Sequence, residues 1–159
     1  MKRQIDQRAK RAASSLALAL AAAVIVIERA DGADLVVRIT HQEVLQGLST
    51  NQKLMFVDAR ESDEWAEERL PSAIQLPLRA VNSEKLQRIP KDAILVPYCI
   101  KDFRGYEVAR ALRRAGYSVR IMDDPGLQGW KGAKLPTAGT LPKQTDTQAM
   151  QALQARARL

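Results

Sequence analysis

Short apolar runs alternate with amphipathic stretches along most of the chain, and this alternation restricts the possible folds more than any other feature of the sequence. The runs are a few residues long and rich in Val, Ile and Leu, as strands are. They occupy residues 35–39, 54–58, 73–76, 93–98 and 119–122. The runs LMFVD (54–58) and AILVPY (93–98) are nearly continuous in apolar residues, a pattern typical of parallel strands that are buried on both faces.

Helix signals fall between these runs. Thr40 and Glu43 have the spacing of a capping box, and Ser62 is a suitable N-cap for the helix that follows it. The expected helices and helical turns cover residues 40–47, 63–68, 83–88, 105–115 and 127–131. Because strands and helices alternate, the sequence predicts an α/β domain whose central, mainly parallel five-stranded sheet is flanked by helices.

An N-terminal hydrophobic segment precedes this domain. Residues 16–27 (LALALAAAVIVI) carry no polar side chain, and five basic residues against Asp6 alone lie before them. This order is typical of a secretory signal or a signal anchor, whose basic flank stays in the cytoplasm. We therefore expect the domain to be exported, either to the periplasm or held outside the inner membrane by this segment. Cleavage is left open, because the small-residue sites at 21–23 and 30–32 are both poor.

Three regions follow from these patterns. Residues 1–33 are the signal or membrane-anchor segment with its link, and residues 34–140 are the folded domain. Residues 141–159 are rich in Gln, Thr, Ala and Arg. We expect them to form a polar tail, loose or helical, that lies outside the core.

Composition excludes several classes of function. The formal net charge is +7, but many of the basic residues lie at the two ends of the chain, and no basic stripe is interleaved with aromatic residues. Nucleic-acid binding therefore has little support. The chain has one cysteine, Cys99, and one histidine, His41. This rules out an internal disulfide framework and argues against a metal site, and nothing in the sequence calls for a cofactor.

Cys99 stands between the predicted strand 93–98 and the predicted helix 105–115. In open parallel sheets, ligands bind outside the carboxyl ends of the strands, and the N-terminus of a following helix favours an anion there. A thiolate in that position is poised to act as a nucleophile. Lys101 adds a positive charge, and Arg104 offers a planar set of donors suited to an oxyanion. The pattern predicts nucleophilic catalysis on a small anion.

Three strings of residues resemble the rhodanese family. YCIKDFRGYEVARAL is similar to the family's active-site segment, in which a cysteine opens a tight loop, an arginine closes it and a helix follows. VDARESDEW, followed by RLPSAIQLPL, resembles the early motif, and GLQGWKGAKLPTAG resembles the terminal one. The strings occur in the family's order and span roughly residues 39–139.

The resemblance implies a single-domain sulfurtransferase. Cys99 would take a sulfane sulfur from thiosulfate or a related small anionic donor, hold it as a persulfide, and pass it to a thiol, cyanide or a protein acceptor. The implied binding loop comprises Ile100, Lys101, Asp102, Phe103, Arg104 and Gly105. Four residues separate Cys99 from Arg104. Sulfurtransferases of the family have a loop of this size, whereas the related phosphatases and arsenate reductases have one residue more.

The loop departs from the family pattern at two positions. Asp102 stands where glycine is common, and Gly105 replaces a small hydroxyl residue. Asp102 would repel thiosulfate if it faced the pocket, or pair with Lys101 or Arg104 if it turned outward. The alternative function is therefore a non-catalytic sulfur carrier or sulfide-binding module that serves a partner protein. Outside the loop, we expect Asp58 and Arg60 to form an ion pair that gives structural support.

Overall fold

The computed structural model describes residues 35–100, 103–123 and 125–159. The chain divides into two units, Met1–Leu35 and Val36–Leu159, and the second holds all the elements below. The predicted signal or anchor segment, residues 1–33, lies outside the described residues. Among the helices of the described part, none has the length and apolar character needed to cross a membrane.

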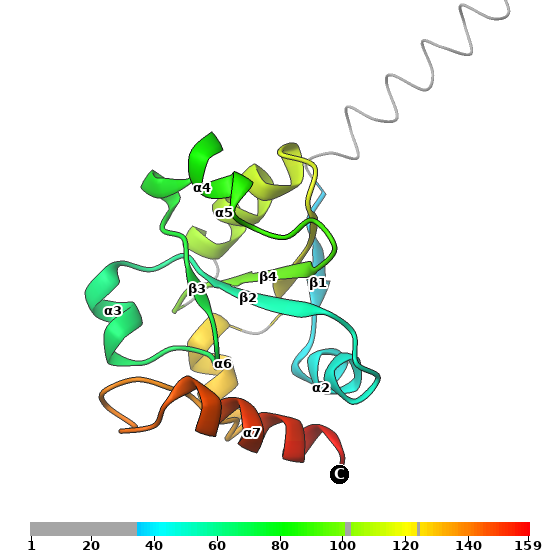
Figure 1. The fold of residues 1–159 in the computed structure, drawn as a ribbon, viewed down its shortest axis with the longest axis vertical. Helices are drawn as coiled ribbons and strands as arrows, with labels where there is room; N and C mark the ends of the chain where they lie inside the picture. Colours follow the sequence, from blue (N-terminus) through cyan, green and yellow to red (C-terminus); the bar gives the residue numbers. More distant parts are fainter. Residues whose placement is uncertain (1–34, 101–102, 124) are drawn as a thin grey trace, which may run out of the picture. The chain divides into compact units, whose positions relative to one another are not determined.

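Five strands of the described chain form one sheet (Figure 1). They are β1 (Val37–Ile39), β2 (Leu54–Asp58), β3 (Ile74–Gln75), β4 (Ile94–Tyr98) and β5 (Ser118–Met122). Their order across the sheet is β1-β5-β4-β2-β3, and every neighbouring pair is parallel. The predicted α/β fold with a parallel five-stranded sheet is confirmed. The two nearly continuous apolar runs among the predicted strands, β2 and β4, lie next to each other in the sheet.

Helices cover both faces of the sheet (Figure 1). In chain order they are α2 (His41–Ser49), α3 (Ser62–Glu67), the 3-10 helix η1 (Leu78–Ala80), α4 (Ser83–Gln87), α5 (Phe103–Arg114), α6 (Gly126–Gly132) and α7 (Asp146–Ala157). One apolar cluster joins the sheet to α4 and α5, and a second joins it to α2, α6 and α7. Successive residues of a strand enter different clusters, as Leu95 and Val96 do in β4.

The start of α2 agrees with the expectation from the sequence, whereas the starts of α3 and α5 differ from it. The capping box of α2 is present, because the Thr40 N–H donates to Glu43 at 2.7 Å and the Glu43 N–H donates to the Thr40 hydroxyl at 3.2 Å. The expectation that Ser62 caps α3 is wrong, since Glu61 is the cap and the Ser62 hydroxyl accepts a hydrogen bond from Gln75. Helix α5 begins at Phe103, so Gly105 lies inside its first turn.

The C-terminal residues are part of the domain. Helix α7 packs against α2, and Ala149 and Leu153 on its inner face are completely buried. Its first residue, Asp146, accepts a hydrogen bond from the Ser72 N–H at 2.7 Å and pairs with Arg69. The expectation that residues 141–159 lie outside the core is therefore wrong. The stripe that docks this helix consists of the fully buried Ala149 and Leu153 with the partly buried Met150, too few apolar residues to mark a core helix in a polar sequence.

Candidate active site

Cys99 directly follows β4, at the carboxyl edge of the sheet where the sequence places it. It is buried, with 3% of its surface exposed, and belongs to the apolar cluster on the α5 face. Its carbonyl oxygen accepts a hydrogen bond from the Leu127 N–H at 2.8 Å. The start of α6 therefore holds the backbone of the cysteine from a segment nearly thirty residues later in the sequence.

Two glycines allow the chain to close around Cys99. A Cβ on Gly126, whose φ is +44°, would lie 1.9 Å from the Cys99 carbonyl oxygen. A Cβ on Gly105 would lie 3.1 Å from the backbone of Tyr98, tighter than ordinary contact. The first turns of α5 and α6 thus both press on the backbone at residues 98–99. Residues with side chains would hold these helices further away.

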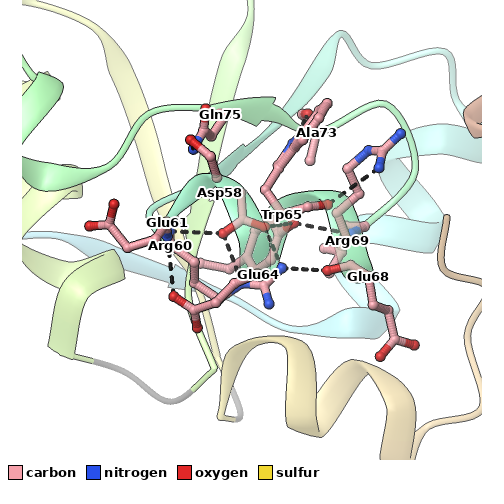
Figure 2. A network of polar contacts seen from close by, with 12 residues as sticks. Asp58, Arg60, Glu61, Glu64, Trp65, Glu68, Arg69, Ala73 and Gln75 are labelled. Carbon is pink, nitrogen blue, oxygen red and sulfur yellow. Dashed lines mark hydrogen bonds and ion pairs between the residues drawn. The ribbon is translucent and has the colours of Figure 1, made fainter. Parts of the chain in front are cut away.

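A buried polar network lies behind the cysteine (Figure 2). Asp58, the last residue of β2, is the register partner of Tyr98, the last residue of β4. One Asp58 carboxylate oxygen accepts from the Tyr98 hydroxyl at 2.7 Å and from Arg60 Nη2 at 2.6 Å. The other accepts from the backbone N–H of Arg60 at 2.9 Å and from its Nε at 3.0 Å. The predicted ion pair is present, with 0% and 3% of the two side chains exposed.

The same network fixes the turn that follows α3. Arg60 also donates to the carbonyl oxygen of Glu68 at 2.5 Å (Figure 2). The Tyr98 hydroxyl accepts from the Leu70 N–H at 3.0 Å. Burial and the neighbouring Asp58 carboxylate raise the pKa of Tyr98 well above its ordinary value. Burial opposes the charge on Arg60, but its hydrogen bonds and ion pair with Asp58 outweigh this and raise its pKa. The network therefore keeps the Tyr98 phenol neutral and the Arg60 guanidinium charged.

Arg104 reaches across to α3. Its two terminal nitrogens donate to the two carboxylate oxygens of Glu64 at 2.7 and 2.9 Å. These hydrogen bonds lower the pKa of Glu64 and raise that of Arg104. Cys99 makes a smaller electrostatic contribution to the raised pKa of Arg104. The arginine predicted to face an oxyanion is thus already engaged by a carboxylate.

Neither Glu64 nor Tyr98 was predicted from the sequence to belong to the site. Glu64 lies inside the quoted string VDARESDEW, four residues after Arg60, at the third position of α3. Tyr98 is the one hydroxyl-bearing side chain in the run AILVPY, immediately before Cys99. A phenol at the end of an apolar strand needs a hydrogen-bond partner when it is buried. This requirement could have identified Tyr98 as part of a polar network.

Apolar and aromatic side chains close to Cys99 in the sequence are exposed to solvent. Ile100 is 38% exposed and Phe103, in the first turn of α5, is 76% exposed. Tyr106 follows one turn later and is also exposed. Lys101 and Asp102, the remaining residues of the predicted loop, lie outside the described residues. Within the described chain, no cluster of His, Cys, Asp or Glu side chains is arranged to hold a metal ion.

The family model of the rhodanese-like domain matches residues 40–133, a range that includes Cys99, Glu64 and Arg104. This chain belongs to the rhodanese-like domain family. A protein named sulfurtransferase from Allochromatium vinosum is 30% identical over 98 residues, which are 62% of this chain and 91% of that protein.

Two further matches are to longer proteins. The probable adenylyltransferase/sulfurtransferase MoeZ of Mycobacterium tuberculosis is 31% identical over 93 residues, 58% of this chain but 24% of its own length. The crystal structure of thiosulfate sulfurtransferase from Pseudomonas aeruginosa superposes with a TM-score of 0.58 and 29% identity, over 66% of this chain and 20% of that one. This rhodanese-like chain thus spans about a quarter of the length of MoeZ.

Proposed function

We propose that this rhodanese-like domain transfers sulfane sulfur through a persulfide on Cys99. The observation that carries the proposal is the position of the thiol, at the carboxyl end of the central strand β4 and four residues before the first-turn Phe103 of helix α5. The helix N-terminus favours negative charge there, which supports both a thiolate and a persulfide anion. The family's named sulfurtransferases support the same chemistry.

The proposed step with thiosulfate is a displacement at sulfur. The Cys99 thiolate attacks the outer sulfur of thiosulfate, a new sulfur–sulfur bond forms, and the bond to the sulfonate breaks. Its electron pair leaves with sulfite, and Cys99 carries a persulfide anion. In the second step, the carbon of cyanide or the sulfur of a thiolate attacks the terminal sulfur. Thiocyanate or a new persulfide leaves, and the Cys99 thiolate is restored.

The test is an intact mass measurement of the protein after incubation with thiosulfate. We expect the mass of one added sulfur atom on the wild type and no addition on Cys99→Ser. Added cyanide should remove the sulfur and release thiocyanate in equal amount. A wild-type protein that gains no sulfur from thiosulfate or from an organic persulfide contradicts the proposal.

A persulfide carrier is the second candidate function. The exposed Ile100 and Phe103 beside the cysteine favour it, because apolar side chains around a thiol suit contact with a protein. In that case the persulfide should form and persist, and cyanide should not turn it over. The same two measurements therefore separate a carrier from an enzyme.

We also propose that the domain works outside the cytoplasm, on the basis of the basic and apolar residues that precede it. If the protein is exported, fractionation of cells that produce the full chain should find it in the periplasm or the membrane. The mass of the recovered protein then shows whether residues 1–33 are retained. Recovery in the cytoplasm alone contradicts export.

A further inference from the structure

We infer that Glu64 determines which sulfur donor the site accepts, by neutralising Arg104 and so favouring an uncharged organic persulfide over the dianion thiosulfate. The inference rests on the proposed function, because it concerns the donor that loads Cys99. It assigns a specificity role to Glu64, a residue of α3 that the sequence did not predict to belong to the site.

The geometry of the ion pair carries the first step. Both terminal nitrogens of Arg104 are bound to Glu64 oxygens, at 2.7 and 2.9 Å. The carboxylate is itself held in place, since Glu64 Oε2 also accepts the N–H of Glu61 at 3.1 Å (Figure 2). The two parallel hydrogen bonds fix the orientation of the guanidinium, and the carboxylate neutralises its charge. An entering oxyanion would have to compete with a carboxylate that belongs to the protein.

The charges near the thiol carry the second step. Arg60, the other arginine next to the site, is paired with Asp58, and both are buried. Within the described part of the site, these two arginines and two carboxylates therefore cancel. Thiosulfate brings two negative charges to a thiolate, and binding it requires a positive field that these paired arginines do not supply. A protonated persulfide brings none.

The apolar surroundings carry the third step. Cys99 is 3% exposed, and the side chains that follow it toward solvent include Ile100 and Phe103, which are 38% and 76% exposed. An organic group attached to a persulfide would bury apolar surface against them. Thiosulfate has no such group. The apolar side chains thus strengthen the binding of an organic persulfide, whereas the paired arginines weaken the binding of thiosulfate.

The loading step with this donor is balanced in atoms and charge. The Cys99 thiolate attacks the terminal sulfur of R–S–SH, and a sulfur–sulfur bond forms at Cys99. The sulfur–sulfur bond of the donor breaks, and its electron pair leaves on the thiolate R–S⁻. The proton stays with the transferred sulfur until the solvent takes it.

The experiment compares the wild type with Glu64→Gln and the matched control Asp63→Asn, which removes an exposed charge one position earlier on the same helix. The donors are thiosulfate and benzyl persulfide, and the rate of sulfur addition to Cys99 is followed by intact mass. We expect the wild type to prefer benzyl persulfide. Glu64→Gln should shift the ratio of the two kcat/KM values about fivefold toward thiosulfate, because removing a partly exposed carboxylate frees one charge worth about 1 kcal/mol. The shift should appear in KM and shrink at high salt.

Two results overturn the inference while leaving the proposed function intact. One is a wild type that prefers thiosulfate, and the other is a Glu64→Gln variant in which both donors change by the same factor. Glu64→Asp, which keeps the charge, should retain the wild-type ratio, and it tests the charge should Glu64→Gln fail to fold. If neither donor loads the wild-type cysteine, the proposed function fails and this inference fails with it.

Discussion

A single carbon atom on Gly126 would collide with the backbone of the cysteine. Its Cβ would lie 1.9 Å from the Cys99 carbonyl oxygen, and the φ of +44° is one that other residues adopt only with strain. We expect Gly126→Ala to lower the free energy of unfolding by about 2–4 kcal/mol, through overpacking and backbone strain together. Denaturant unfolding measures this loss.

Gly132 provides the matched control at the other end of α6. A Cβ there meets no atom within 4 Å. Gly132→Ala should leave the free energy of unfolding within about 0.5 kcal/mol or raise it slightly, since alanine restricts the unfolded chain. Equal effects of the two substitutions would show that the close approach to Cys99 is not what requires glycine at position 126.

Single residues also show the limit of reasoning from sequence. The Asp58–Arg60 pair was predictable because two residues of opposite charge stand two apart after a strand. The Arg104–Glu64 pair joins residues forty positions apart, on helices whose mutual placement only the folded sheet decides. The sequence therefore predicted Arg104 as a cation for a bound anion, whereas in the structure it is paired with Glu64. Glu64 stands in the sequence, but its pairing with Arg104 could not be predicted from it.

Among the elements, α7 packs into the apolar cluster that it shares with α2 and α6. Leu153 is completely buried in the cluster that also contains Val44 of α2 and Trp130 of α6. Leu153→Ala removes this contact and leaves a cavity. We expect a loss of about 2–4 kcal/mol in the free energy of unfolding. Gln154→Ala, at the exposed neighbouring position, should change it by less than about 0.5 kcal/mol.

An α7 that frays independently would give a different result. The Leu153→Ala variant would then unfold at the wild-type denaturant concentration, and only helicity would fall.

The strands and α5 were predictable because apolar residues repeat along them with the period of their own structure. Helix α7 contributes few apolar residues, and its place in the core depends on Asp146 meeting Ser72 and Arg69 across the fold.

For the molecule as a whole, the network behind Cys99 couples stability to alkaline pH. Burial beside Asp58 raises the folded-state pKa of Tyr98 well above 10.0, its ordinary value, which we take for the unfolded chain. Between these two pKa values the unfolded state has released the phenol proton and the folded state has kept it. The stabilisation is therefore complete below about pH 10 and is lost progressively as the pH rises above that value.

Tyr98→Phe separates this effect from general alkaline denaturation. At neutral pH the variant should be less stable by about 1–3 kcal/mol, because Asp58 loses a donor and the Leu70 N–H loses its acceptor. Above about pH 10 its free energy of unfolding should fall less steeply than that of the wild type, since it has no phenol to ionise. Tyr106→Phe, an exposed substitution on α5, should follow the wild-type slope. Parallel slopes for the wild type and Tyr98→Phe would mean that the buried phenol does not control the alkaline limit of the fold.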